Sequence, residues 1–406
     1  PARNYLNHLK LRLSWGQLGN QAGIGLYDHY QYINIGGTYP FGNSNNPLKV
    51  PNASLGAMPA VDRTWETIET YNAGIDFATL NNRLSGTFDY FIKDNKNMFY
   101  AEEFPTILGT SAPSINGAHV RTNGWELTLN WKDKIGKVGY RIGLNLSDNK
   151  TKVISLSDSR NPGHGLMGFV EGYPTNSFFI YEFDGFIKDE ADLADYETKM
   201  KGGVPTNLRV GDAKYVDKDG DGVLEPTLYK EGDPNSGDIV YKGTNNQRYL
   251  YGINLGLDWK GIDVSAFLQG VGKWDCINGT YAGGGEVWKQ SSQYFYHNTW
   301  SPDRPNAEYP RLTQDGGIHG YNYQWSDAPY KFFNNRYLRL KEVQIGYTFP
   351  TTLTKKIGVE KLRVYATGMN LLEWDNLPNG FDPEAPYTEN LIPFSRTYSI
   401  GVNVQF

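Results

Sequence analysis

The sequence lacks several features that most enzymes and helical membrane proteins use. Among 406 residues there is one cysteine, Cys276, and the six histidines form no HExxH motif and no close pair. No G-x-S-x-G elbow and no phosphate-binding P-loop is present. No apolar run approaches the ~18–20 residues of a membrane-spanning helix, and mean hydropathy is −0.55. These absences exclude an intrachain disulfide and a helical membrane protein.

The sequence also lacks a large excess of either basic or acidic residues. The chain has 39 basic and 44 acidic side chains, with a formal net charge of −5 at pH 7. No basic surface for nucleic acid is therefore expected. Among so many acidic residues, loop carboxylates are solvated charges far more often than catalytic groups, and no catalytic triad can be assembled. We predict that the protein is not an enzyme and does not bind nucleic acid.

Strict alternation of apolar and polar residues is the strongest pattern that is present. In the last segment, RTYSIGVNVQF (396–406), apolar residues from Tyr398 to Phe406 share one face of an extended strand. Similar runs approach the ~9–11 residues of a membrane β-strand and exceed the ~5–6 of an average soluble strand. These further runs are 9–15, 71–77, 84–92, 125–131, 138–146, 249–259, 262–268, 343–349 and 362–366.

Short and long connections alternate between these runs. The short ones are 81–83, 132–137 and 260–261, and the long ones are 17–65, 98–119, 150–173, 272–335 and 372–395. Compact soluble domains rarely contain loops beyond ~12–15 residues, whereas outer-membrane barrels combine short periplasmic turns with long external loops. With GDIVYKG (237–243) as a further strand, the total is about twelve. The sequence predicts an all-β fold, a transmembrane antiparallel β-barrel.

Aromatic residues near the strand ends fit the girdles of such a barrel at the membrane interfaces. The alternative is that they pack the core of a soluble sandwich. In the barrel, polar residues on the opposite strand faces would wall a water-filled interior. These residues are Asn72, Asp76, Asn130, Asn145, Asn254 and Asp258.

Several stretches resemble the SusC/RagA family of TonB-dependent outer-membrane transporters. They include LKLRLSWGQLGNQ (9–21), ETYNAGIDFATLNNRLSGTFDYFIKDNKNM (69–98), YLYGINLGLDWKGIDVSAFLQG (249–270) and NNRYLRLKEVQIGYTFP (334–350). The resemblance implies that residues 1–406 hold about the last twelve strands of a 22-strand barrel whose lumen is plugged by an N-terminal domain. Because the chain begins at Pro1, we expect a partial chain that lacks the plug, the earlier strands and the TonB-engaging segment.

The resemblance also implies a function and partners. Such proteins import nutrient oligomers, glycans or peptides, across the outer membrane of a Gram-negative bacterium, driven by the TonB complex. They pair with a SusD/RagB-like surface lipoprotein. The resemblance is also compatible with a dimer of two such transporter–lipoprotein pairs. Phe406 is expected to be the assembly signal that the barrel-assembly machinery reads. Two alternatives stay open: a stand-alone outer-membrane barrel, porin or hydrolase, and a soluble calcium-dependent glycan-binding β-protein.

The sharpest local motif is DKDGDGVLE, 217–225. Carboxylates at positions 1, 3 and 5, followed by Gly222, match a calcium-binding loop, but position 12 is Leu228 instead of a bidentate Glu. We predict a structural calcium or magnesium ion and no other cofactor, with a metal-free Asx-turn as the alternative. The expected ligands are Asp217, Asp219, Asp221, Val223 and Glu225.

Two of the expected external connections have a character of their own. The first, 187–246, holds the Asp-rich motif and a short helix predicted over 188–200. The second, 272–335, is dense in aromatic residues, with Asn, Gln and Gly between them. Such a composition suits sugar stacking, a protein interface or the connection's own small core.

Overall fold

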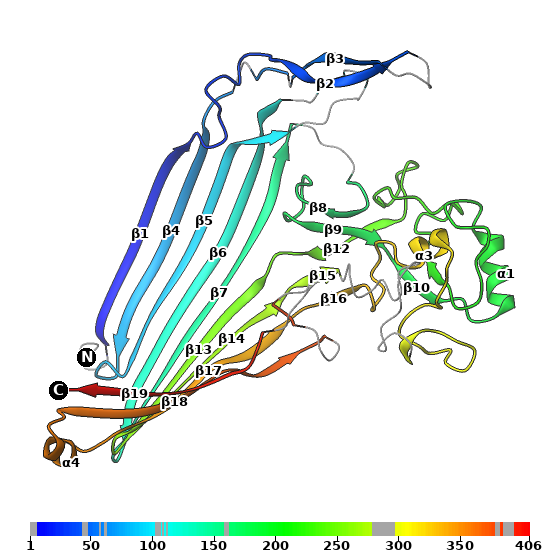
Figure 1. Ribbon diagram of the computed structural model, residues 1–406. Helices are drawn as coiled ribbons and strands as arrows, with labels where there is room; N and C mark the ends of the chain where they lie inside the picture. The colour runs from blue at the N-terminus through cyan, green and yellow to red at the C-terminus, as the bar shows by residue number, and fades with distance from the viewer. Residues whose placement is uncertain are drawn as a thin grey trace.

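The computed structural model describes residues 6–42, 48–56, 58–60, 63–101, 107, 109–110, 113–157, 162–277, 297–377, 382–384 and 394–406. Its main body is a twisted, curled antiparallel sheet of ten strands (Figure 1). In spatial order the strands are β1 (Leu6–Asn20), β4 (Glu66–Thr79), β5 (Leu84–Ala101), β6 (Ser114–Ile135), β7 (Val138–Leu156), β13 (Arg248–Trp259), β14 (Ile262–Lys273), β17 (Tyr337–Thr348), β18 (Lys361–Asp375) and β19 (Thr397–Gln405).

Short connections gather at one end of this sheet, the lower end in Figure 1. Lys260 and Gly261 both have positive φ, 47° and 90°, between the paired residues Trp259 and Ile262. Two positive-φ residues define a type I′ turn, whose twist matches that of the flanking strands. A longer connection at the same end contains α4 (Thr351–Thr354) and η3 (Lys355–Ile357).

The predicted strand at 237–243 is not part of this sheet. It forms β12 (Ile239–Thr244), which pairs with β9 (Ser177–Tyr181) in a three-stranded sheet completed by β8 (Gly165–Met167). Because β7 pairs directly with β13, the antiparallel alternation is complete without it. The prediction of about twelve strands is therefore corrected to ten in the described residues. The reason is burial: Ile239 is fully enclosed and cannot face hydrocarbon.

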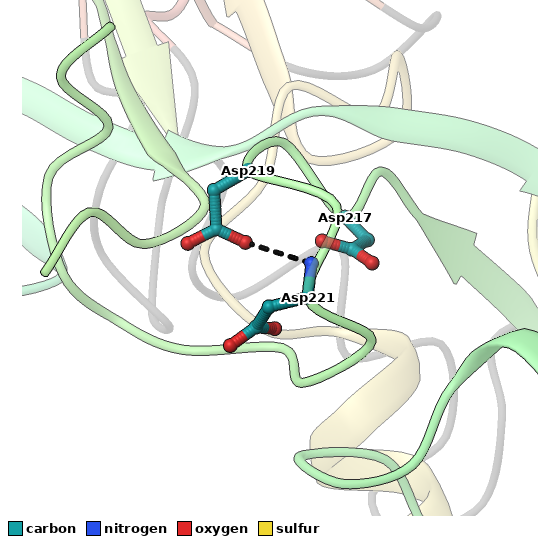
Figure 2. Close-up of side chains that lie close together, drawn as sticks. All are labelled: Asp217, Asp219 and Asp221. Carbon is teal, nitrogen blue, oxygen red and sulfur yellow. Dashed lines mark hydrogen bonds between the residues drawn. The ribbon is translucent and has the colours of Figure 1, made fainter. Parts of the chain in front are cut away.

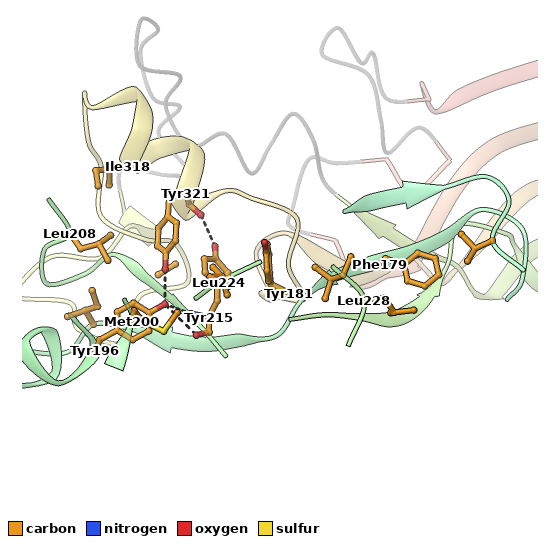
Figure 3. Close-up of a cluster of buried hydrophobic side chains, with 14 residues drawn as sticks. Phe179, Tyr181, Tyr196, Met200, Leu208, Tyr215, Leu224, Leu228, Ile318 and Tyr321 are labelled. Carbon is orange, nitrogen blue, oxygen red and sulfur yellow. Dashed lines mark hydrogen bonds between the residues drawn. The ribbon is translucent and has the colours of Figure 1, made fainter. Parts of the chain in front are cut away.

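The connection between β7 and β13 folds together with part of the connection between β14 and β17. We call their described residues, 162–246 and 297–331, the loop domain. It contains β10 (Phe183–Phe186), α1 (Glu190–Lys199), β11 (Ala213–Tyr215) and α3 (Gly316–Asn322) besides β8, β9 and β12. Its core holds Phe179, Tyr181, Tyr196, Tyr215 and Tyr321 (Figure 3). Burying each such side chain contributes about 1.5–3 kcal/mol to the stability of this domain.

The α1 helix lies within the range predicted from the sequence. Its N-cap is Asp189, whose side chain accepts a hydrogen bond from the backbone N–H of Asp192. A cap of this kind satisfies one of the backbone donors that a helix start leaves open. Tyr196 is the helix residue that is buried in the core of the loop domain.

Among the residues that the structure describes, none forms a core against the apolar face of the ten-stranded sheet. Leu11 is 70% exposed, Leu255 41%, Ile400 83% and Val402 57%. Exposed apolar area of this extent is not tolerated in water by a monomeric soluble protein. Among the described residues, no helix has the length and apolar character needed to cross a membrane.

Candidate functional site

The opposite face of the sheet is polar and is tied together by ion pairs between strands. Arg12 on β1 lies 2.9 Å from Asp76 on β4 and 2.7 Å from Asp89 on β5. Arg363 on β18 lies 2.5 Å from Asp263 on β14. The register places the predicted wall residues on this face as well: Asn72, Asp76, Asn130, Asn145, Asn254 and Asp258. The face therefore suits contact with water.

A concave region of about 470 Å³ lies on this polar face, toward the end of the sheet that carries the long connections. Thr128 donates a hydrogen bond to Asn145 at 3.0 Å within it. Amide, hydroxyl and carboxylate groups share the wall with apolar and aromatic side chains, among them Leu250, Tyr251 and Val271. Such groups bind polar oligomers through hydrogen bonds and stacking. The wall includes Glu126, Thr128, Asn145, Ser147, Phe267 and Gln269.

The loop domain is held by buried hydrogen bonds across its two chain segments. Tyr215 donates its hydroxyl to the carbonyl oxygen of Tyr321 at 2.9 Å. Asp212, which is 0% exposed, accepts a hydrogen bond from Asn322 at 2.9 Å and lies 2.8 Å from Arg311. Because these groups are buried, losing a partner would leave polar atoms unsatisfied. Burial also raises the pKa of Tyr215 and Tyr321 above the ordinary tyrosine value.

The structure describes residues 272–277 and 297–335 of the aromatic connection predicted at 272–335. Tyr321 and Tyr330 are 7% and 3% exposed and lie in the loop-domain core. Trp274 is 9% exposed and donates its indole N–H to Asn245 at 2.8 Å. For these residues the structure favours the connection's own core over sugar stacking. Five aromatics of the same stretch lie outside the described residues: Tyr281, Trp288, Tyr294, Phe295 and Tyr296.

The Asp-rich motif forms one compact turn (Figure 2). Oxygen atoms of Asp217, Asp219 and Asp221 all lie within 4.8 Å of one another. Backbone N–H groups of Gly220 and Gly222 donate to Asp217 at 2.8 Å each. The carboxylate oxygens are thus preorganised in a small space, an arrangement that fits a hard cation.

The remaining residues of the motif differ in their placement. Val223 donates its backbone N–H to Asp221 at 2.7 Å, which is an Asx-turn contact. Glu225 does not belong to the carboxylate group formed by the three aspartates in the described residues. Gly222 has a φ of 88°, and a Cβ there would lie 2.8 Å from the carbonyl oxygen of Lys199. The turn therefore requires glycine, with or without a metal.

A fourth carboxylate beside this turn is not apparent from the motif. Asp238 is 0% exposed, and its two oxygens accept backbone N–H bonds from Lys218 at 2.5 Å and from Glu225 at 2.7 Å. Burial raises its pKa, and the charges of Asp219 and Asp217 raise it further. A cation bound by those two aspartates would offset that last effect. The metal site itself stays a prediction.

An apolar ribbon lies in the connection between β1 and β4. Its strands are β2 (Ile33–Phe41) and β3 (Leu48–Leu55), paired only with each other. The pairs Ile33–Leu55 and Phe41–Leu48 join large apolar side chains across it. Their exposed fractions lie between 57% and 67%. The two pairs lie on opposite faces of the ribbon, because Leu48 and Leu55 are seven positions apart in β3. A lone two-stranded ribbon is marginally stable in water, so its exposed apolar side chains call for a covering surface.

A buried arginine ties the last long connection to the polar face. Arg339 on β17 is 1% exposed. Its Nη2 lies 2.5 Å from Glu373 and 2.7 Å from Asp382, and its Nη1 lies 3.3 Å from Glu384. The residues Asp382 and Glu384 belong to FDPE (381–384), which follows β18. A buried charge with several opposite partners is strongly destabilised when one partner is removed.

Comparison with known proteins agrees with this two-faced sheet. No protein-family model matches the chain. It is 27% identical over 370 residues to TonB-dependent receptor P3 of Formosa agariphila, covering 84% of this chain. It is 26% identical over 436 residues to TonB-dependent receptor SusC of Bacteroides thetaiotaomicron, covering 99%. The chain is homologous to SusC-type TonB-dependent receptors. It spans 34% and 38% of the length of these two relatives.

Solved structures show the same fold. The RagAB peptide importer in the 'open-open' state matches with a TM-score of 0.73 at 24% identity, over 99% of this chain and 40% of that chain. Its 'closed-closed' state gives a TM-score of 0.72 at 23% identity, over 99% and 41%. The ten strands thus have the fold of a wall segment of a transmembrane β-barrel. The TonB-dependent receptors among the relatives place this barrel in the outer membrane of a Gram-negative bacterium. The relatives are receptors, which supports the prediction of a non-enzymatic role.

Proposed function

We propose that this chain is the wall of an importer that carries nutrient oligomers through the outer membrane with energy from TonB. The observation that carries the proposal is the two-faced sheet: Ile400 and Leu255 are exposed on one face, and Arg12 is paired with Asp76 and Asp89 on the other. A barrel wall between hydrocarbon and water needs both faces. Homology to SusC-type receptors supports the energy source.

The concave region on the polar face is proposed as part of the route for the substrate. Its amide and hydroxyl groups, such as Asn145 and Gln269, hydrogen-bond equally well to sugar hydroxyls and to peptide amides. Glycans and peptides therefore both remain as cargo classes. Mass spectrometry of the small molecules that co-purify with the native receptor would name the class.

A surface lipoprotein of the SusD/RagB type is the proposed partner. The apolar ribbon, with Ile33 and Phe41 exposed at 64% and 57%, is the proposed part of its contact surface. Replacing Ile33 and Phe41 by Asp should reduce the lipoprotein recovered with the affinity-purified receptor. Asn34 and Thr38 replaced by Asp in the same strand are the matched control. If the variant at Ile33 and Phe41 recovers as much lipoprotein as the control variant, the assignment is contradicted.

Uptake by whole cells tests the import proposal most simply. A labelled oligomer of the identified class should enter cells that carry the receptor, and uptake should stop when TonB is removed. Energy dependence separates active import from diffusion through a pore. Uptake that continues at the same rate without TonB would favour the porin alternative.

A further inference from the structure

The apolar face of the sheet ends in basic residues toward the long connections. On β6 and β7, Leu127 pairs with Leu146, and further along the same strands Arg121 pairs with Lys152. No register shift separates these two pairs, and they lie six positions apart on each strand, so their side chains share one face. Lys150 lies on this face too. The three basic side chains therefore point toward the membrane side of the wall.

Aromatic side chains mark the membrane interface just beside this cluster. Trp15 on β1 donates its indole N–H to Glu69 on β4 at 3.0 Å, and Tyr71 donates its hydroxyl to the same carboxylate at 2.8 Å. Trp and Tyr combine an apolar ring with a polar N–H or O–H group and are typical of the lipid headgroup level. The register continues from Glu69 across β5 to Arg121 and Lys152. The basic cluster thus lies at headgroup level.

Acidic neighbours leave part of this positive charge unbalanced. Arg121 lies 2.9 Å from Asp94, which also contacts His119 at 2.7 Å. Lys150 and Lys152 are exposed, and in the described part of the chain no ion pair links either one to an acidic side chain. Asp148, the nearest acid on their own strand face, is already paired with Arg248.

Like charges directly across a strand pair are destabilising in the absence of a counter-ion. Arg121 and Lys152 are such a pair, with Asn123 opposite Lys150 in the adjoining pair of the same face. Facing side chains at this distance, about 4.5–5.5 Å between Cβ atoms, can share one anion. A phosphate accepts hydrogen bonds from guanidinium, ammonium and amide groups at once. The cluster is therefore suited to a phosphate.

We propose that Arg121, Lys150 and Lys152 bind the phosphate groups of a membrane lipid. The acyl chains of that lipid would lie along the apolar part of the same face, beginning at Trp125 and Leu127. Continuity of the basic cluster with the hydrocarbon-facing surface favours a lipid over a soluble phosphate compound. The inference depends on the membrane position of the sheet and not on what is transported.

Lipid binding can be measured on the intact receptor by native mass spectrometry in mild detergent. The probes are bisphosphorylated lipid A, the same lipid A with both phosphates removed, and inorganic phosphate alone. Lys150→Gln with Lys152→Gln should lower the affinity for bisphosphorylated lipid A about tenfold or more, because each basic group near an anionic surface contributes on the order of 1 kcal/mol. Lys150→Arg with Lys152→Arg keeps both charges and should restore binding.

A matched control removes two charges from the polar face of β5 and β6. Lys93 pairs with Thr122 and Lys132 with Arg141, and both lysines lie on the polar face. Lys93→Gln with Lys132→Gln should leave lipid A binding unchanged. Heat-modifiable migration on gels would confirm that each variant is folded.

Three outcomes would overturn the proposal. The Gln variant at 150 and 152 could bind lipid A as tightly as the wild-type receptor. Dephosphorylated lipid A could bind as tightly as the phosphorylated form, which would show that the acyl chains alone account for binding. Inorganic phosphate could bind at the same affinity as lipid A, which would make the site one for free phosphate.

Discussion

The hydroxyl oxygens of Tyr196 and Tyr321 lie 2.8 Å apart, although 125 positions separate the two residues in the chain. Tyr196 lies on α1 in the connection after β7, and Tyr321 lies on α3 in the connection after β14 (Figure 3). The Tyr196 hydroxyl also accepts the backbone N–H of Tyr215 at 3.2 Å. Two external connections are therefore locked into one domain above the barrel wall.

Removing that hydroxyl should loosen the loop domain. Tyr196→Phe leaves the N–H of Tyr215 and the hydroxyl of Tyr321 without their partner, which costs about 1–3 kcal/mol for buried groups. Hydrogen-exchange mass spectrometry of the receptor should show roughly tenfold or more faster exchange in α1 and β11. Tyr323→Phe is the control, because the buried Tyr323 hydroxyl has no hydrogen-bond partner in the described residues. Equal exchange in Tyr196→Phe and wild type would contradict the coupling.

The loop domain should weaken in acid through Glu182. Lys218 and Lys242 donate to this carboxylate at 2.5 Å and 2.7 Å, and these bonds hold its pKa below the ordinary value. A carboxylate with a lowered folded pKa stabilises the fold above its unfolded pKa of about 4.3, and the gain is lost as pH falls through the folded value.

Glu182→Gln should therefore destabilise the loop domain at pH 7 by about 1–2 kcal/mol, with no difference from wild type in strong acid. The measurement is exchange of β9 and β12 at pH 7 and after a brief acid step. Glu197→Gln on the exposed side of α1 is the matched control. A Glu182→Gln effect that is the same at both pH values would refute the ion-pair explanation.

Calcium should stabilise the Asp-rich turn. A ligand that binds only the folded state at 100 times its Kd adds about 2.7 kcal/mol. Thermal melting after EDTA should therefore shift upward when Ca²⁺ is restored, and Asp217→Asn with Asp221→Asn should abolish the shift. Glu231→Gln, an exposed acid outside the turn, should keep it. An identical melting temperature with EDTA and with Ca²⁺ would favour the metal-free Asx-turn over a calcium site.

Phe406 should matter for assembly. It follows β19 and is 88% exposed, so packing within the chain does not account for an aromatic residue there. Deleting Phe406 should lower the amount of heat-modifiable receptor in the outer membrane, whereas Phe406→Tyr should keep it near the wild-type amount. Equal amounts of barrel from the deletion and from wild type would count against an assembly signal.

The wall of the barrel was predictable because its environment imposes a period of two. The pair Leu127 and Leu146 faces hydrocarbon, and the adjacent pair Thr128 and Asn145 faces water. Apolar and polar residues therefore alternate along the sequence of each strand. Alternation, together with the positions of short turns such as Lys260–Gly261, therefore identified the strands of the main sheet. The number of strands was less predictable, since a segment like 237–243 can alternate and still pair elsewhere.

The loop domain and its neighbours could not be derived in the same way. β9 is buried along its whole length, so it carries no alternation. The ribbon of β2 and β3 does alternate, but a register shift between Ile35 and Thr38 interrupts the pattern. Partners such as Arg339 and Asp382 lie 43 positions apart, and only the folded chain brings them together. The Asp-rich turn was visible because its carboxylates are close in sequence, whereas Asp238 was not.

Lipid and water accessibility along β13 tests the central claim most directly. Spin labels placed one at a time at positions 253 to 256 of the receptor in lipid vesicles can be probed with oxygen, which concentrates in hydrocarbon, and with a water-soluble nickel chelate. Ile253 and Leu255 are predicted to favour oxygen, and Asn254 and Gly256 the nickel chelate, in strict alternation. Equal accessibility to both reagents at all four positions, or protection of Ile253 and Leu255 from oxygen, would contradict a wall between membrane and lumen.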